Sequence, residues 1–455
     1  MIIKPGRNVA VYSSRPELDF SFHRLGTGSG PTLLVVGGIQ GDEPGGFSAA
    51  SLLVTNYRIQ SGQVWVVPNL NFPSIVLRSR GDSGDMNRKF AHVDRKDPDY
   101  DAVKNIQNII RAPEVSLILN LHDGSGFYRP QWEDAMHNPK RWGQSVIIDQ
   151  DFLGISSDFA ELKNMAQTAA LDANRGLLNE EHRYHVHNTE TSKGDKEMEK
   201  TLSYFAVRNG KPAFGVEASK NFTTEFRIYY HIQILESFMR QMGIAFERNF
   251  PLTPQGIKNA VNSNVGITLY NERMFLALDD VRPHLRYVPM QKEAPVDLKS
   301  TTPLVALLRE KKEEGGNWRV AYGNRILTRI SPQYMEFDEN VPYVEMVQDG
   351  KTSTVPMGRL ITVKDSFLVK GAKGYRVNAI GAVKEKADGS ESDVVLRKKD
   401  FMPNYSVDTK ATTYRVEVYK GKAFAGMILV RFGAPHPNTK ETMTAVKGPE
   451  SEFGF

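Results

Sequence analysis

Apolar runs and amphipathic stretches alternate through the first half of the chain. β-rich apolar runs at 32–36, 63–67, 115–119, 145–148, 184–186 and 213–216 predict strands. Stretches at about 47–54, 101–110, 155–178, 197–208 and 223–243 predict helices. This order predicts an α/β domain over residues 1–246, in which helices cover both faces of a sheet.

The pattern changes near residues 247–254, where Pro251 and Pro254 suit a linker. After them the long helical signals largely stop. Short strand-like runs at 265–269 and 325–330 predict a small β-rich domain over 247–346. A polar stretch at 348–353 marks its end.

The last part of the chain has the pattern of an antiparallel sheet. Apolar and charged residues alternate over 414–419, as in a half-buried strand, and 424–432 form the return strand. These signals predict an immunoglobulin-like β-sandwich over 347–434. The polar segment 435–455, which holds three prolines, is predicted to be a flexible tail.

Composition excludes several kinds of site. The 455 residues include no cysteine, which excludes disulfides, thiolate metal sites and a cysteine nucleophile. The net charge is +5, but basic and acidic residues are mixed without a basic block, so we expect no nucleic-acid binding. No apolar run approaches the roughly 20 residues that span a bilayer. The start of the sequence lacks the apolar region of a signal peptide, so the protein is cytoplasmic or a signal has been removed.

Polar candidates follow three of the predicted strands. Gln40 and Glu43 lie in a glycine-rich segment after strand 32–36, and their spacing lets them converge on one face of a turn. His122 follows strand 115–119, and a neutral imidazole is a common zinc ligand. Ligands bind outside the carboxyl ends of strands in open α/β sheets, so these weak signals strengthen one another.

Two further groups lie at the same predicted edge. Arg78, Arg80 and Arg88 share a polar loop, and guanidinium groups suit bidentate recognition of carboxylates or oxyanions. Glu217 ends strand 213–216, where a carboxylate can take a proton from an attacking water.

The ordered set Gln40-x-x-Glu43, Asn87-Arg88, His122 and Glu217 resembles the zinc metallocarboxypeptidases of the funnelin family over roughly residues 30–240. That family has histidine where this chain has Gln40. The glutamine makes the chain resemble more specifically the periplasmic peptidoglycan DL-carboxypeptidases that determine helical cell shape. The resemblance implies a mixed-sheet catalytic domain followed by two smaller β-rich domains.

The resemblance also implies roles for individual residues. Gln40, Glu43 and His122 would hold Zn²⁺, and Glu217 would act first as general base and then as general acid. Arg88 with Asn87 would bind the terminal carboxylate, Arg80 or alternatively Arg78 would stabilise the oxyanion, and Trp142 would line the pocket. It assigns no role to His185, His187 or Tyr204.

The implied reaction is removal of terminal meso-diaminopimelate from a peptidoglycan tripeptide in the periplasm, which affects cell shape. Muropeptides would be the partners in this reaction, and the C-terminal β domains are candidate surfaces for protein partners. Two alternatives stay open. The first is an N-acyl amino acid deacylase of the aspartoacylase type, because residues 41–44 of this chain also resemble a segment of those enzymes. A non-catalytic cell-wall-binding module is disfavoured by Glu217, because binding needs no general base.

Overall fold

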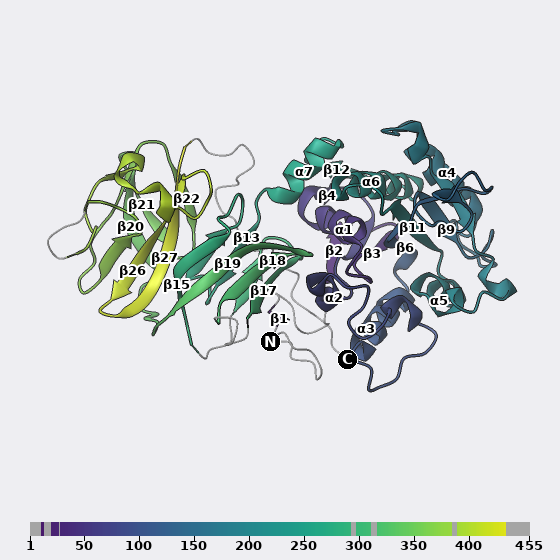
Figure 1. Cartoon of the computed structure of the whole chain (residues 1–455), viewed down its shortest axis with the longest axis horizontal. Coiled ribbons are helices and arrows are strands. Elements are labelled where there is room, and N and C mark those ends of the chain that lie inside the picture. Colours follow the sequence, from purple (N-terminus) through teal and green to yellow (C-terminus); the bar gives the residue numbers. More distant parts are fainter. Residues whose placement is uncertain are drawn as a thin grey trace. The chain divides into compact units, whose positions relative to one another are not determined.

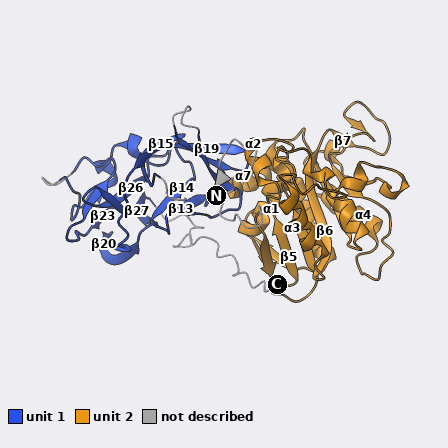
Figure 2. Cartoon of the chain, turned by 90° about the horizontal axis from the view of Figure 1, so that it is seen from below, with its two compact units in different colours: residues 1–3, 7–14, 262–455 blue, residues 4–6, 15–261 orange. Residues whose placement is uncertain are grey.

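The computed structural model describes residues 11–12, 20–26, 28–292, 297–310, 316–384 and 389–433. The chain forms two compact units, shown in two colours in Figure 2. We call the one that consists mainly of residues 15–261 the N-terminal unit, and the one from residue 262 onward the C-terminal unit. The predicted tail at 435–455 lies outside the described residues.

The N-terminal unit contains a seven-stranded mixed sheet (Figure 1). In chain order its strands are β2 (His23–Gly26), β3 (Thr32–Val36), β5 (Gln63–Val67), β6 (Val115–Gly124), β9 (Ser145–Ile148), β10 (His185–Asn188) and β11 (Ala213–Ser219). Their spatial order is β10-β9-β11-β6-β3-β5-β2. The central strands β11, β6, β3 and β5 are parallel, and β9 and β2 are antiparallel to β11 and β5.

Helices cover both faces of this sheet, as the alternation of patterns predicts. Figure 1 shows α1 (Pro44–Asn56), α4 (Leu162–Arg175) and α6 (Thr224–Gln241) along one face, with α3 (Tyr100–Arg111) and α5 (Leu202–Arg208) along the other. The short α2 (Phe72–Leu77) follows β5. The predicted mixed α/β fold is therefore confirmed.

Some predicted bounds differ from those of the structure. The helix predicted at 155–178 extends only over Leu162–Arg175. Gly154, Ser156 and Ser157 precede it, and such residues favour turns over helix interiors. Gly176 follows the last helical residue, a position where glycine commonly ends helices.

The predicted linker at 247–254 overlaps regular structure at both ends, and only residues 249–253 are irregular. β12 (Phe246–Arg248) pairs with β4 (Tyr57–Ile59), and α7 (Pro254–Asn262) begins at the second proline. Proline is well tolerated in the first turn of a helix, so Pro254 starts an element where a linker is expected from composition. The boundary predicted after residue 246 falls within β12, and the N-terminal unit extends to Val261. The domain boundaries themselves stay predictions.

The C-terminal unit begins with two small sheets. One has the order β1-β17-β18-β19-β15 and the other β14-β13-β16. Their strands are β1 (Val11–Tyr12), β13 (Gly266–Leu269), β14 (Met274–Ala277), β15 (His284–Met290), β16 (Leu298–Ser300), β17 (Val305–Arg309), β18 (Trp318–Tyr322) and β19 (Arg325–Tyr334).

The rest of this unit is a sandwich of two four-stranded sheets, as predicted. The first contains β20 (Tyr343–Gln348), β21 (Lys351–Pro356), β23 (Ser366–Val369) and β25 (Leu396–Arg397); the second contains β22 (Leu360–Val363), β24 (Arg376–Ala379), β26 (Thr413–Lys420) and β27 (Ala423–Phe432). Met346, Phe367 and Val416 are among the buried residues of its core. Within the described ranges, no helix combines the length and apolar character needed to cross a membrane.

Asp149, directly after β9, is a buried carboxyl without a cationic partner among its described hydrogen bonds. Its Oδ1 atom accepts hydrogen bonds from the hydroxyl groups of Thr191 and Thr189. Burial raises the pKa of Asp149 from 3.8 to about 6. A carboxyl whose pKa rises on folding binds its proton more tightly in the folded state. The contribution of this proton binding to the free energy of unfolding is therefore fully present below pH 3.8. It is lost as the pH rises through about 6.

Asp149→Asn should therefore stabilise the protein at pH 7.5 by up to about 3 kcal/mol, because the amide has no charge to bury. The amide oxygen can still accept the hydrogen bond from Thr191. Denaturant unfolding at pH 7.5 and pH 4 measures the effect, and the advantage of the variant should disappear at pH 4. Equal stabilisation at both pH values would contradict this assignment.

Candidate active site

The carboxyl ends of three neighbouring strands bring the predicted site residues together. Gln40 and Glu43 follow β3, His122 lies in β6 and Glu217 lies in β11. β6 lies between the other two strands, and the register pairs Glu217 with His122. The order of the strands therefore brings Gln40 and Glu43 close to His122 and Glu217, which are distant from them in the sequence.

The loop between β3 and α1 depends on glycine. Gly38 has a φ of +72°, which favours a residue without a side chain. A Cβ atom on Gly41 would lie 2.0 Å from the carbonyl of Ser74, so this close approach also requires glycine. α1 then begins at Pro44 with Glu43 as its N-cap residue. The tight loop therefore fixes the position of Glu43.

The predicted metal ligands are in mutual contact. Nδ1 of His122 lies 3.0 Å from Oε1 of Gln40 and 3.0 Å from Oε2 of Glu43, and all three side chains are buried. Zinc ligands lie about 2.0–2.2 Å from the metal, so neighbouring donors of a tetrahedral site are about 3.3 Å apart. The donor atoms are close to this spacing, and the three residues fit a metal ion.

The donor set is unusual in one respect. Among the described residues, no group of three His, Cys, Asp or Glu side chains could hold a metal. The amide oxygen of Gln40, which contacts His122, is the additional donor that a metal between Glu43 and His122 could use. Amide oxygen is a poorer donor to zinc than imidazole, so Gln40 is the weak ligand of the set.

Asp85 orients the Gln40 amide, a contact that was not predicted from the sequence. Nε2 of Gln40 donates to Oδ1 of Asp85 over 2.8 Å, which leaves the amide oxygen directed at His122. Burial favours a higher pKa for Asp85, but the hydrogen bond from Gln40 and the charges of Arg80 and Arg88 hold that pKa below its ordinary value. Asp85 therefore stays ionised and acts through Gln40.

Glu217 is buried opposite His122, and its Oε2 atom has no hydrogen-bond partner in the described part of the chain. Burial, followed by the nearby carboxylates of Glu43 and Asp123, raises the pKa of Glu217 well above its ordinary value. A carboxylate with an unpaired oxygen and a raised affinity for protons is suited to general acid–base chemistry.

Two cations lie on the other side of Glu43. Nη1 of Arg80 is 3.2 Å from Oε1 of Glu43, and Nζ of Lys220 is 3.3 Å from the same oxygen. Glu43 thus contacts cations through Oε1 and His122 through Oε2. Lys220 was not predicted; its only sequence signal is its place just after β11.

Asn87 and Arg88 lie in the 3-10 helix η1 (Met86–Arg88). Asn87 accepts a hydrogen bond from the backbone of Leu202 over 3.0 Å, and its Nδ2 lies 3.4 Å from Nε2 of His122. Nη1 of Arg88 donates to the carbonyl of Asn87, and its Nε lies 3.5 Å from Oε2 of the exposed Glu197. The Arg88 side chain is 32% exposed, so a ligand can reach it.

A cavity of about 240 Å³ joins these groups. All but one of the predicted site residues line it: Gln40, Glu43, Arg80, Asn87, Arg88, His122, Trp142 and Glu217. The exception is Arg78, which is exposed and caps the C-terminus of α2 with a φ of +56°. The sequence left open whether Arg78 or Arg80 would stabilise the oxyanion, and Arg80 is the one that lines the cavity.

A buried network behind the cavity supports the ligands. Asp123 accepts hydrogen bonds from the backbone of Gly45 over 2.8 Å and from Arg227 over 3.1 Å, and its Oδ1 atom lies 3.1 Å from Nε2 of His231. The backbone N–H of Asp123 donates to Oε2 of Glu43. Asp123 therefore connects β6 to α1 and α6 beside the ligands. Its sequence signal, adjacency to His122, does not reveal this role.

The three residues without a predicted role are not among those that line the cavity. His187 stacks on Tyr128 with ring centroids 4.0 Å apart and lies 4.9 Å from the ring of Trp142. Burial lowers the pKa of His185 and of His187 to about 4, so both are neutral at physiological pH. Tyr204 is buried in α5. His187 therefore packs against a cavity residue without contributing charge.

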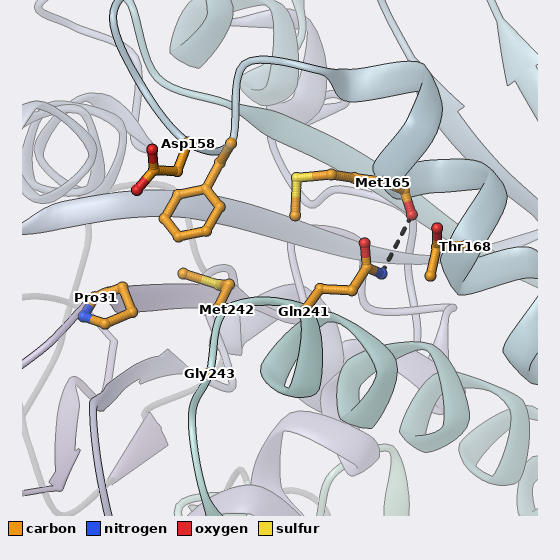
Figure 3. Close-up of a pocket in the computed structure, with 8 residues that line it drawn as sticks. Pro31, Asp158, Met165, Thr168, Gln241, Met242 and Gly243 are labelled. Atoms are coloured by element: carbon orange, nitrogen blue, oxygen red, sulfur yellow. Dashed lines mark hydrogen bonds between the residues drawn. The ribbon is translucent and has the colours of Figure 1, made fainter.

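A second hollow of the N-terminal unit, about 750 Å³ in volume, is shown in Figure 3. It lies beside Pro31, which precedes β3, and Met242 and Gly243, which follow α6. Gln241 donates a hydrogen bond to the carbonyl of Met165 at its edge. None of the predicted site residues lines this hollow.

Two family models match the chain. The model described as the catalytic domain of a carboxypeptidase controlling helical cell shape matches residues 24–262. A model of the C-terminal domain of metallo-carboxypeptidase matches residues 337–433.

Crystal structures of Csd4 from Helicobacter pylori are similar over most of the chain. The apo structure has a TM-score of 0.83 and 37% identity, and the match covers 91% of this chain and 100% of that one. The tripeptide-bound structure has a TM-score of 0.82, 37% identity and the same coverage. The mDAP-bound form of Csd4, described as a D,L-carboxypeptidase, has a TM-score of 0.82 and 38% identity, covering 90% of this chain and 100% of that one.

A shorter match involves a different enzyme. The N-alpha-acetyl-L-2,4-diaminobutyric acid deacetylase of Halomonas elongata is 33% identical over 105 residues. This match covers 21% of this chain and 30% of that protein.

Proposed function

Because this chain belongs to the family of carboxypeptidases that control helical cell shape, we propose that it is a zinc-dependent D,L-carboxypeptidase of peptidoglycan stem peptides. It removes terminal meso-diaminopimelate from the tripeptide and leaves the dipeptide. Similar structures with bound tripeptide and bound mDAP support this substrate class. A peptidoglycan substrate supports a location in the periplasm and a role in determining cell shape.

The observation that carries the proposal is the contact among Gln40, Glu43 and His122, with Glu217 paired with His122 on the neighbouring strand. When bound there, zinc supplies Lewis acidity and makes water acidic enough to act as a nucleophile near neutral pH. Gln40, Glu43 and His122 would hold it, leaving the cavity side open for water and substrate.

Glu217 carries the proton transfers. Its unpaired oxygen accepts the proton of the attacking water and then delivers that proton to the leaving amine, so one group serves as base and acid.

The arginines recognise and stabilise anions. Arg88 binds the terminal carboxylate of the substrate, with Asn87 beside it, because its exposed guanidinium can make two parallel hydrogen bonds. Arg80 faces the oxyanion that forms at the scissile carbonyl. Its contact with Glu43 keeps its guanidinium beside the reacting centre.

Mass spectrometry of a peptidoglycan digest, incubated with and without the protein, tests the proposal. We expect tripeptide muropeptides to decrease and dipeptide muropeptides to increase, with equimolar release of free meso-diaminopimelate. A chelator should abolish the change and added zinc should restore it. An unchanged digest in the presence of zinc would exclude this activity.

Deacylation of N-acyl amino acids is the second candidate, because of the local match to a deacetylase. That match covers less than a third of the deacetylase, whereas the D,L-carboxypeptidase structures match along their whole length. Acyl-aspartate and acyl-glutamate substrates, assayed beside muropeptides, separate the two candidates. Turnover of the acyl amino acids alone would favour the deacylase.

Gln40→His should bind zinc at least about tenfold more tightly, because imidazole replaces a neutral amide oxygen as ligand. Asp85, which accepts the hydrogen bond of the Gln40 amide, can accept one from an imidazole N–H in the same way. Titration against a competing chromophoric chelator at pH 7.5 measures the affinity. Gln40→Ala serves as the control and should bind zinc more weakly than the wild type. Equal or weaker binding by Gln40→His would contradict the role of residue 40 as a ligand.

A further inference from the structure

A cleft of about 990 Å³ opens within the C-terminal unit, and its lining includes residues of β15, β24 and β26. Its lining is strongly unbalanced in charge. Five cationic side chains face it, whereas Glu417 is the one carboxylate among the described residues that line it; the cations are Arg282, Arg286, Arg376, Arg415 and Lys422. The whole chain has 58 basic and 53 acidic residues, so this imbalance is local.

A bulge in β15 forms one wall of the cleft. The register of β15 against β19 shifts between Leu285 and Val288, and Tyr287 has a φ of +53°. A tyrosine rarely adopts this conformation, and bulges commonly redirect side chains. Arg286 and Tyr287 are both exposed here, Tyr287 to 71%.

Buried charged groups hold this bulge in place. Arg415 is only 7% exposed, and its guanidinium donates to the carbonyls of Tyr287 over 3.2 Å and Arg286 over 3.0 Å. The same guanidinium lies 3.3 Å from Oε1 of Glu417, which is 2% exposed, and the other oxygen of Glu417 accepts a hydrogen bond from Tyr419. Burying an ion pair is unfavourable unless its partners are well placed. The hydrogen bonds from Arg415 therefore stabilise the backbone of the bulge at the wall of the cleft.

The cations differ in how free they are to bind a ligand. Arg282 donates to the carbonyls of Ser406 and Pro403, so it braces the opposite wall. Arg376 lies 4.7 Å from the ring centroid of Tyr419 at the floor. Arg286 and Lys422 are exposed, and no carboxylate of the described residues forms an ion pair with either. These two side chains are available to an anionic ligand.

Tyrosine rings accompany the free cations. Tyr287, Tyr334 and Tyr405 line the cleft and are 71%, 38% and 46% exposed. Of the apolar residues in the lining, Leu285 and Val407 are buried, and Met335 and Ile380 are partly buried. Flat aromatic rings beside guanidinium groups suit sugar rings that carry carboxylates, because ring faces pack on C–H groups while guanidinium pairs with carboxylate.

We propose that this cleft is a second binding site, which holds a carboxylate-bearing glycan strand of peptidoglycan. The choice of polymer rests on the proposed function, but the cleft takes no part in the reaction. Arg286 and Lys422 pair with carboxylates of the strand, and the tyrosines pack against its sugars. The C-terminal unit thereby retains the polymer while the cavity of the N-terminal unit acts on stem peptides.

Cosedimentation of the full-length protein with purified sacculi tests the proposal, with chelator present so that no turnover occurs. The double variant Arg286→Glu with Lys422→Glu should bind sacculi at least about tenfold more weakly, with an unchanged melting temperature. The matched control is Lys351→Glu with Lys373→Glu, which makes the same charge change at exposed sandwich positions outside the cleft. It should bind within about twofold of the wild type.

If the two double variants weakened binding equally, the effect would be one of general charge and the proposal would be overturned. Undiminished binding of sacculi by the cleft variant would also overturn it. Tyr287→Ala distinguishes a glycan from an acidic peptide: it should weaken binding of sacculi more than binding of poly-glutamate. Poly-glutamate that binds as tightly as sacculi and displaces them would overturn the glycan assignment. Muropeptide turnover, assayed separately with zinc, decides the proposed function independently of these results.

Discussion

Glu217→Gln should lower kcat on a tripeptide muropeptide by about 10²–10⁴-fold, because an amide cannot accept the proton of the attacking water. Glutamine has nearly the same shape as glutamate, so the KM and the zinc affinity should stay close to those of the wild type. Steady-state kinetics with zinc present, together with a zinc titration, measures the three quantities.

The same substitution should leave the metal-free protein at least as stable as the wild type. Glu217 is buried, and its Oε2 atom has no hydrogen-bond partner in the described structure, so glutamine removes an unfavourable buried charge. Functional residues commonly reduce stability in this way. Thermal unfolding in the presence of chelator measures the effect.

Glu236→Gln is a matched control for Glu217, because Glu236 is also buried in the N-terminal unit but has partners. Its Oε1 atom accepts a hydrogen bond from Tyr57 over 2.7 Å and pairs with Arg248. This variant should lose stability and keep its kcat. If both variants instead lost stability and activity together, Glu217 would have a structural role and not a catalytic one.

Arg88→Ala should lower kcat/KM by about 10- to 150-fold, the effect of losing a charge-assisted contact of roughly 1.5–3 kcal/mol. The loss should be smaller on a substrate whose terminal carboxylate is amidated, since that substrate makes no such contact in the wild type. Kinetics on the two substrates form a cycle that isolates the interaction.

Arg78→Ala provides the comparison for this loop. Arg78 is exposed and lies outside the cavity, whereas Arg88 lines it. We expect a change of less than about twofold in kcat/KM for Arg78→Ala. A larger loss for Arg78→Ala than for Arg88→Ala would show that Arg78, and not Arg88, binds the terminal carboxylate.

The location of the site could be predicted because three strong strand signals precede its residues. The runs before Gln40, His122 and Glu217 are apolar enough to identify buried parallel strands, and parallel strands present their carboxyl ends at one edge. The motif spacing then selected residues within a few positions of those ends. Periodicity and topology suffice for the location, whereas the roles of the residues come from the resemblance to the metallocarboxypeptidases.

The residues that support the ligands could not be predicted in this way. Asp85, Lys220 and Asp123 act through side-chain directions that depend on packing between distant segments. Each looks in the sequence like an ordinary surface charge near a motif. α7 was missed for a related reason, because Pro254 suits a loop and the first turn of a helix equally well.

Gln40 also has a consequence for the effect of acid on the site. An amide oxygen carries no proton at any physiological pH, whereas an imidazole must lose one before it binds a metal, and its ordinary pKa is about 6.5. With glutamine at residue 40, protons would not compete with the metal for this ligand. The greater zinc affinity expected of Gln40→His should therefore shrink as the medium becomes more acidic. The natural site would therefore have a lower zinc affinity at neutral pH, but one that depends less steeply on acidity than that of Gln40→His.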